Sequence, residues 1–421
     1  MSMRHISEGP SLVVYQHAEE AGFLAELRAQ AVRAPHYDLD DLRTLDERLE
    51  AHLDGLRIAG RAGLDLLLRQ LGAQASGEVF AATVLACESG DAAVLARIAE
   101  QLRAFPETGR GFAAALGWLD WTSVEPWVER LLAAPEPLFR RLGLAACGRH
   151  RIDPGPALPA GLAHAEPGVV ARAARSAGEL RRRDLMAEVR AHRRHADEAV
   201  RFWANWATAQ MGDEEALEPL RRFAGQAGEF QWRALAVLVG WQDHAFSVAW
   251  LRALAQNPAQ RRPVILGAGL LGDPLAVPWL IRQMHELPLA RIAGEAFSLI
   301  AGADLALLDL ERSEIPDFDA GPTDDPGDPR VAMDPDEDLP WPDPARIAAW
   351  WQANGASLET GRRHLLGRPL DEAQCRQVLC RGRQRQRNAA AVALARLRPG
   401  EPLFPTDAPA KRQRALLDAH G

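Results

Sequence analysis

Apolar residues recur at steps of three and four along most of the chain, the period of an amphipathic helix. The clearest run comes early, where five leucines would share one helix face: Leu42, Leu45, Leu49, Leu53 and Leu56. Residues 11–60 therefore predict two long helices separated at Ala34-Pro35, with Asp38 as the N-cap of the second. Because the apolar face must be covered, we expect these helices to cap the array that follows.

An aspartate then recurs at a nearly constant distance. The spacings are 29, 33, 31, 29, 30, 30 and 31 residues, and the positions are Asp91, Asp120, Asp153, Asp184, Asp213, Asp243, Asp273 and Asp304. A unit of about 30 residues has room for two helices of about 10 to 12 residues and two turns. The pattern predicts one apolar helix before each aspartate and a second helix after it.

Each of these eight aspartates is predicted to cap the second helix of its repeat. A carboxylate at this place accepts hydrogen bonds from the free amides of the helix and lies at the positive end of its dipole. Pro274 directly follows Asp273, and Pro126, Pro219 and Pro278 come five or six residues after their aspartates. Proline is tolerated there because the helix is still in or near its first turn.

Two of the joints resemble short HEAT-like repeats, in which GD is followed by a V-P-x-L helix: GDPLAVPWLI at 272–281 and GDEEALEPLRRF at 212–223. The resemblance covers roughly residues 78–310 and implies an α-solenoid. We therefore expect an all-α protein with four parts: N-terminal capping helices at 1–75, a solenoid of HEAT-like helical repeats at 76–310, an acidic, proline-rich linker at 311–344 and a small C-terminal helical module at 345–421.

Composition agrees with helices, because aromatic residues make up only 6% of the chain and tyrosines number 2. The net charge of −8 is concentrated in residues 311–344, which hold 12 acidic residues and 2 arginines, so the remainder sums to +2. The chain outside residues 311–344 therefore lacks the strong positive electrostatic field that favours nonspecific nucleic-acid binding. With no long apolar run, a cytoplasmic protein without a membrane segment is expected.

Motifs that would carry catalysis or hold a cofactor are not found in the sequence. HAEE at 17–20 lacks the second histidine of HExxH, and no phosphate-binding glycine motif occurs. The four cysteines lack the spacing of a zinc site, so reduced, buried thiols are expected. We expect no catalytic residue, no metal and no cofactor, and hence a protein that is not an enzyme.

Three tryptophans and two arginine clusters are the candidates for partner binding. Trp127, Trp250 and Trp279 come six or seven residues after their aspartates, at a place where another repeat has Leu220, so they are either core or interface residues. The arginines are Arg183, Arg190 and Arg194, expected to share a helix face, and Arg383, Arg385 and Arg387. The first cluster is either a solvated face or a site for phosphates or an acidic protein surface, and each of the two clusters is also a candidate receiver for the acidic linker.

Four stretches outside the repeats resemble a family of bacterial HEAT-repeat proteins encoded in type VI secretion gene clusters. They are VVYQHAEEAGFL at 13–24, RAPHYDLDDLRTLDERLEAHLDGLRIAG at 33–60, DPDEDLPWPDPARIAAWW at 334–351 and QRQRNAAAVALA at 384–395. The resemblance implies an adaptor or chaperone-like accessory protein. Its partner would be an effector, a component of the secretion spike or a thiolase-like accessory protein.

Two other classes of function remain open at this point. HEAT-like folds also occur in DNA glycosylases, which place Trp and Asp around an extruded base, so a nucleic-acid-binding protein or enzyme is the main alternative. That alternative requires a basic concave groove. A chromophore lyase related to other short HEAT-like proteins is the third class, and it requires a reactive pocket that the sequence does not identify.

Overall fold

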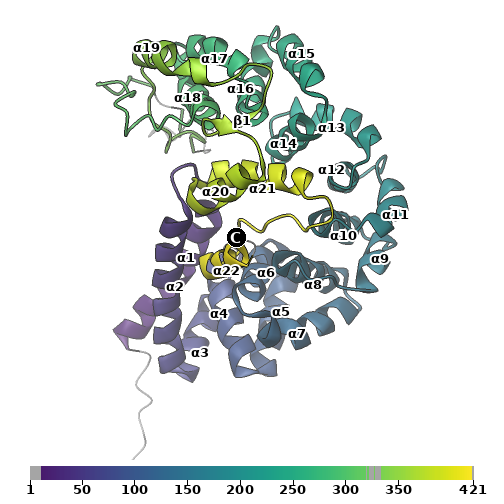
Figure 1. Cartoon of the computed structure of the whole chain (residues 1–421). Coiled ribbons are helices and arrows are strands. Elements are labelled where there is room, and N and C mark those ends of the chain that lie inside the picture. Colours follow the sequence, from purple (N-terminus) through teal and green to yellow (C-terminus); the bar gives the residue numbers. More distant parts are fainter. Residues whose placement is uncertain (1–10, 319, 322–326, 328–332, 420–421) are drawn as a thin grey trace, which may run out of the picture. The chain divides into compact units, whose positions relative to one another are not determined.

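The computed structural model describes residues 11–318, 320–321, 327 and 333–419 of the chain (Figure 1). Two compact units make up this part. Unit 1 contains the described residues of 1–33, 37–204 and 405–421, and unit 2 contains those of 34–36 and 205–404. The border between the units falls inside the predicted solenoid, between Ala204 and Asn205; of the predicted C-terminal module, residues 345–404 belong to unit 2 and the described residues of 405–421 to unit 1.

The described chain is all-α, as predicted. It forms 22 α-helices with short 3-10 turns, and its only strands are two of two residues each. Helix α12 (Glu198–Gln210) crosses the border between the units.

Unit 1 is a stack of helix pairs. Its helices are α1 (Leu12–Ala31), α2 (Leu39–Ala59), α3 (Arg61–Gln70), α4 (Ser76–Ser89), α5 (Ala92–Ala104), η1 (Pro106–Thr108), α6 (Gly109–Trp118), α7 (Trp121–Ala133), α8 (Pro137–His150), α9 (Ala157–Leu162), α10 (Pro167–Leu180), η2 (Arg183–Leu185), α11 (Met186–Arg190) and α22 (Ala410–Asp418). The first helices of the repeats, α4, α6, α8 and α10, pack in succession, and α1 packs against α4.

The N-terminal helices form as the sequence predicts. Asp38 caps α2: its side chain accepts from the amides of Asp40 and Asp41, and the Asp41 side chain completes the capping box. The five leucines of the α2 stripe are all buried, with exposed fractions of 3% or less. Burying a leucine side chain contributes about 1.5–3 kcal/mol, so this stripe fixes α2 against its neighbours.

Unit 2 continues the helix pairs and adds C-terminal elements. The repeats contain η3 (Glu214–Ala216), α13 (Leu217–Ala224), α14 (Gln231–Trp241), α15 (His244–Leu254), η4 (Pro258–Gln260), α16 (Arg261–Leu271), η5 (Pro274–Ala276), α17 (Val277–Gln283) and α18 (Leu287–Ala301). The C-terminal elements are α19 (Pro344–Asn354), η6 (Gly355–Ser357), β1 (His364–Leu365), β2 (Arg368–Pro369), α20 (Glu372–Arg381) and α21 (Gln384–Leu397).

The C-terminal elements of unit 2 attach to the first helices of its repeats. The amide of His364 donates to the Gly272 carbonyl at the end of α16 (2.8 Å), and the amide of Leu366 donates to the Leu299 carbonyl in the last turn of α18 (2.7 Å). Helix α21 packs against α14, on the side of the first helices (Figure 1). Carbonyls in the last turn of a helix lack partners within that helix, so the hairpin β1–β2 satisfies groups that would otherwise need water.

The described ends of the acidic segment are also held in unit 2. The amide of Arg312 donates to the Trp341 carbonyl (2.9 Å), which brings the two ends together. Asp336 forms two bonds with Arg262 of α16 (2.6 and 2.7 Å), and Asp334 pairs with Arg291 of α18. Residues 319, 322–326 and 328–332 of the predicted linker lie outside the described residues. Asp334 and Asp336 therefore pair with arginines of α18 and α16, which are in neither predicted cluster.

Candidate protein-interaction surfaces

Four of the eight joint aspartates accept hydrogen bonds from the start of the following helix. Asp91 accepts from the amides of Ala93 and Val94, Asp243 from Phe246, Asp213 from Glu215 and Asp273 from Leu275. In the repeats of Asp213 and Asp273, the second helix begins with a 3-10 turn, η3 and η5 respectively. These bonds are local and structural, as the capping prediction requires.

The capping prediction is wrong in detail at the other four joints. Asp120 is at the N-cap position of α7 but makes no capping bond. Asp304 accepts from Leu307 in a run of turns, because the last repeat has no second helix. Asp153 and Asp184 both pair with Arg182, each at 2.6 Å, and this bond lowers the pKa of Asp184. Asp153 also accepts a hydrogen bond from the amide of Gly155 (2.9 Å), just before α9 begins at Ala157.

The three candidate tryptophans are half-buried residues of second helices. Trp127 lies on α7, where the Arg130 guanidinium is 4.7 Å from its ring centroid. In unit 2, Trp250 on α15 and Trp279 on α17 both pack against the core cluster of Val239, Leu251, Val264 and Leu271. Leu220, at the matching place, is fully buried. Trp250 and Trp279 thus each present one side to the core and retain an exposed part.

The first arginine cluster is exposed but does not share a helix face. Arg183 is in the 3-10 turn η2, Arg190 ends the five-residue helix α11, and Arg194 lies in the turns that follow. All three side chains are exposed. The expected face is absent because the second helix of this repeat is too short to carry it.

The second arginine cluster is engaged within unit 2. Arg383 pairs with Asp304 (3.2 Å), and Arg385 pairs with Glu295 (2.9 Å) and donates to the Pro335 carbonyl (2.9 Å). Arg387 is fully buried; its Nε donates to the Leu379 carbonyl (2.7 Å) and its Nη1 to Gln384. Arg387 is therefore not a surface residue, which corrects its prediction as a partner-binding group. Through Pro335, Arg385 does contact the acidic segment.

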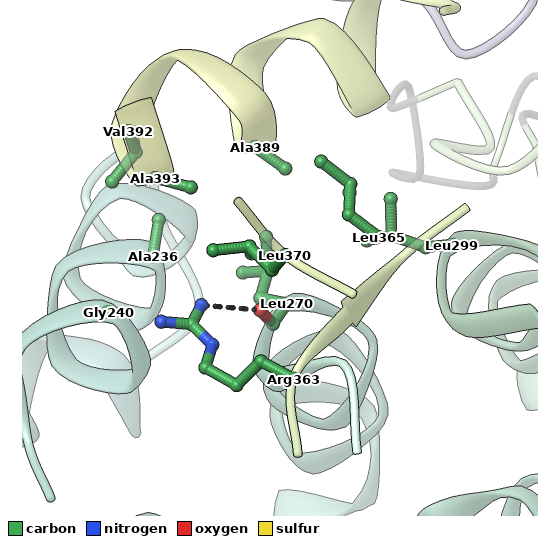
Figure 2. A pocket seen from close by; sticks show the side chains of 10 residues that line it. All are labelled: Ala236, Gly240, Leu270, Leu299, Arg363, Leu365, Leu370, Ala389, Val392 and Ala393. Carbon is green, nitrogen blue, oxygen red and sulfur yellow. Dashed lines mark hydrogen bonds between the residues drawn. The ribbon is translucent and has the colours of Figure 1, made fainter. Parts of the chain in front are cut away.

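The cavity in Figure 2 is too small for a substrate. It lies where α14, α16 and α18 meet the β1–β2 hairpin and α21, and its lining is mostly leucine and alanine. Its internal volume of about 20 Å³ is room for about one water molecule. Arg363, its one charged lining residue, donates to the carbonyls of Leu270 and Leu271 at the end of α16. The guanidinium thus caps a helix, and Figure 2 shows it turned toward Leu270.

Reactive thiols and metal-ligand clusters were also considered. Burial raises the pKa of Cys87, Cys147 and Cys375 to about 12, so these thiols stay protonated at neutral pH. Among the residues that the structure describes, no three His, Cys, Asp or Glu side chains are grouped to hold a metal ion. Within the same residues, no helix is long and apolar enough to cross a membrane.

C-terminal residues also pack on the first helices of unit 1. Arg28 of α1 donates to the carbonyls of Asp407 (3.2 Å) and Ala408 (2.9 Å), and it pairs with the buried Asp46 (2.6 Å). Arg412 of α22 donates to the carbonyls of Gly117 and Leu119 at the end of α6. In each unit, therefore, part of the first-helix side is occupied by the C-terminal part of the chain itself.

Close to this segment, unit 1 holds a cluster of charged groups that the sequence analysis missed. Four arginines and two carboxylates form it: Arg149, Arg151, Arg172, Arg175, Glu179 and Asp407. Glu179 is buried and bonds to Arg172 and, at 2.8 Å, to Arg175. Burial alone would raise the pKa of Glu179, but these arginines hold it well below its usual range. We call this set the arginine cluster.

No spacing rule could have identified the arginine cluster, because its last member is more than 200 residues from the others. One local signal was available. Helices α4, α16 and α18 end on left-handed glycines, Gly90, Gly272 and Gly302, whereas α8 and α10 end on Arg151 and Arg181, each with φ of 56°, and of these two only Arg151 belongs to the cluster. Left-handed backbone is costly for a residue with a Cβ, so an arginine at this place is unusual.

Comparison with known proteins agrees with this architecture over part of the chain. No curated protein matches the sequence significantly. A family model described as HEAT repeats matches residues 155–238, which begin just after Asp153 and end within α14. Together with the stacked helix pairs of both units, the match shows that this chain is an all-α solenoid of HEAT-like repeats.

Proposed function

We propose that this protein is a non-enzymatic scaffold that binds another protein through the second helices of its repeats. HEAT repeats commonly mediate interactions between proteins, and a family model for them matches here. The finer proposal is an adaptor or chaperone-like role in type VI secretion, with an effector, spike component or thiolase-like accessory protein as partner. Its support is the resemblance of residues 13–24, 33–60, 334–351 and 384–395.

One observation favours the second helices as the binding surface. The first-helix sides are partly occupied by the chain's own C-terminal segments, whereas Trp250 and Trp279 remain half-exposed on second helices. Tryptophan is enriched among residues that dominate binding energy, because it buries a large rigid surface. Both rings rest on one core cluster, so they are held in place before a partner arrives.

Affinity capture with matched variants tests the proposal. The full-length protein, tagged and expressed at its natural level in its own cell, is expected to retain a secretion component or effector. In Trp250→Leu/Trp279→Leu, leucine keeps the core packing, as Leu220 does in its repeat, and removes the aromatic surface. We expect recovery of the partner to fall at least about tenfold, the effect of losing one hot-spot residue.

Leu307→Ala is the control, because Leu307 is 83% exposed in unit 2 but lies in turns outside the second helices. Capture of no protein by the wild type would overturn the scaffold proposal. Capture of a partner unrelated to secretion would overturn only its type VI setting. If Trp250→Leu/Trp279→Leu recovers as much partner as the wild type does, these tryptophans do not form the binding surface.

A further inference from the structure

Three arginines of unit 2 lie at the same place in three successive repeats. Arg222, Arg252 and Arg282 each come nine residues after a joint aspartate, so they are 30 residues apart along the chain. They lie in the last turns of α13, α15 and α17, the second helices of these repeats. All three residues are exposed. We call this set the arginine row.

The three helices that carry the arginine row are neighbours. The Arg221 guanidinium of α13 lies 4.7 Å from the ring centroid of Phe246 on α15. Trp250 of α15 and Trp279 of α17 pack against one core cluster. Packed helices are about 8–10 Å apart, so the row runs across the repeats with about that distance between successive members.

The charges of the arginine row are not neutralised within the described part of the chain. Arg222, Arg252 and Arg282 take part in no salt bridge or side-chain hydrogen bond there. Glu218, four residues before Arg222, pairs with Arg221 instead. Helices α15 and α17 contain no acidic residue. A partner therefore finds three positive charges in a line without displacing an existing ion pair.

The residues beside the arginine row give the surface the composition of a protein interface. A cation in the last turn of a helix is favoured by the helix dipole, and this effect alone could account for a single arginine. It does not account for the aromatic groups on the same helices: Phe246 is 45% exposed, and Trp250 and Trp279 are half-buried. Arginine and aromatic residues are both enriched where proteins bind one another.

Protein carboxylates match this surface better than a nucleic-acid backbone does. Proteins that bind duplex DNA through its phosphates make on the order of 6–10 such contacts, whereas the row offers three charges. Glu214 and Glu218 are exposed at the start of the first of these second helices, where they would repel a phosphate backbone. A segment with a few well-spaced acids avoids this repulsion.

We propose that the arginine row binds an acidic segment of the partner protein, with one carboxylate of that segment to each of the three repeats. In an extended segment, which rises about 3.3 Å per residue, an acid at every third residue gives a spacing of about 10 Å. In a helix, an acid at every seventh residue gives about 10.5 Å. Apolar residues of the same segment would contact Trp250 and Trp279. This inference rests on the proposed function, because it assigns the chemistry of the partner that the second helices bind.

Selection from a peptide library tests this chemistry with a defined probe. Phage that display random peptides of about 16 residues, long enough for three acids at steps of seven, are selected on the full-length protein. The salt concentration is about 0.05 M, at which charges are weakly screened. We expect the recovered peptides to contain Asp or Glu at steps of three or seven residues. The most enriched peptide is then labelled with fluorescein and titrated by fluorescence anisotropy.

Neutral variants of the arginine row test the assignment. Arg222→Gln/Arg252→Gln/Arg282→Gln should bind the labelled peptide at least about tenfold more weakly than the wild type, since three exposed ion pairs are lost. Raising the salt to about 0.3 M should weaken binding to the wild type more than binding to this variant, because screening acts on charge pairs. A merely structural role of these arginines would not change the salt dependence.

The matched control is Arg362→Gln/Arg381→Gln/Arg396→Gln. It makes the same change in net charge at exposed residues among the C-terminal elements of unit 2, and we expect it to leave the affinity near the wild-type value. Thermal melting checks that both triple variants are folded.

Three results would overturn the inference: no enriched peptide, enriched peptides without spaced acids, or equal affinities of the two triple variants. Binding of a labelled DNA duplex of about 20 base pairs that is lost in the row variant would also overturn it, because the row would then bind phosphates. The proposed function fails separately, if the wild type captures no natural partner. If Trp250→Leu/Trp279→Leu loses that partner while the row variant retains both partner and peptide, only the present inference fails.

Discussion

At the scale of single residues, arginine has two opposite roles in this protein. Arg183, Arg190 and Arg194 are exposed, whereas Arg387 is fully buried and donates to a main-chain carbonyl. Arginine and glutamine alternate over residues 383–387, and nothing in this pattern separates Arg387 from Arg383 and Arg385. Burial is decided by the direction of the helix face, which tertiary packing fixes.

Arg387→Ala tests this structural role. The substitution leaves the Leu379 carbonyl without its donor and opens a cavity, so we expect a loss of about 2–4 kcal/mol from the unfolding free energy of unit 2. Arg387→Met fills most of the volume of the arginine side chain, so the unfolding free energy should fall by less. Arg381→Ala, at an exposed position of α20, should change stability by less than about 0.5 kcal/mol. Urea unfolding measures all three; equal values for Arg387→Ala and Arg381→Ala would contradict the assignment.

His150 predicts how the stability of unit 1 depends on pH. Burial lowers the pKa of His150 to about 4, against an ordinary value near 6.5, although its bond to the Leu116 carbonyl opposes this shift. Between these values the unfolded chain binds more protons than the folded one. Stability should therefore fall as pH decreases from about 6.5 toward 4, with a slope of up to about 1.4 kcal/mol per pH unit.

His150→Phe should make this slope shallower without abolishing it, because burial also lowers the pKa of His52. His285→Gln, at an exposed position of unit 2, should leave the slope unchanged. Thermal melting in buffers from pH 4.5 to 7 provides the measurement, and an unchanged slope in His150→Phe would contradict the prediction.

At the scale of elements, the joints between helices decide how the C-terminal elements of unit 2 attach. Gly272 ends α16 with φ of 75°, and its carbonyl accepts from His364. A Cβ at this place would be 2.1 Å from the His364 carbonyl oxygen. The same glycine thus provides a left-handed turn and the close approach of the β1–β2 hairpin.

Comparing Gly272→Ala with Gly90→Ala should separate the cost of the left-handed turn from the cost of the close approach of the hairpin. Gly90 has a similar φ of 67°, but no atom would lie within 4 Å of an added Cβ. Gly90→Ala should cost about 1 kcal/mol for the left-handed backbone alone, and Gly272→Ala clearly more because the hairpin must move. Limited proteolysis should then cut near residues 361–370 in Gly272→Ala only. Equal stability losses and no new cleavage would contradict this account.

Much of the element structure was predictable, because helix period and turn chemistry are local. Residues 345–421, which the sequence predicts to be helical, contain most of α19 and all of α20, α21 and α22. The β1–β2 hairpin was missed, since each strand has two residues and depends on helix ends far away in sequence. The missing second helix after Asp304 and the pairing of Arg182 with Asp153 and Asp184 were not predictable for the same reason: both depend on contacts between elements.

At the scale of the whole molecule, the C-terminal segment joins sequence positions that are far apart. Arg28 and the Asp407 carbonyl that it binds are separated by 379 residues. This contact brings residues 405–419 into unit 1, after the chain has passed through unit 2. No composition or periodicity in the sequence indicates this return.

Removing residues 405–421 should therefore destabilise unit 1 and leave unit 2 largely unchanged. The buried Asp46 would lose the Ala410 amide, and α6 would lose its contacts with Arg412. We expect the melting temperature of unit 1 to fall by several degrees, the effect of about 1–2 kcal/mol in a domain of this size. Arg412→Ala should give a smaller fall and exposed Lys411→Ala none; an unchanged melting curve after the deletion would contradict the prediction.

The return of residues 405–419 also has a consequence for synthesis on the ribosome. About 200 residues separate the two parts of unit 1, and translation at about 5–20 residues per second needs roughly 10–40 s to cross them. During this interval Arg28, Asp46 and Arg149 have no peptide segment to contact. Unit 1 can therefore complete its contacts only after residues 405–419 have left the ribosome.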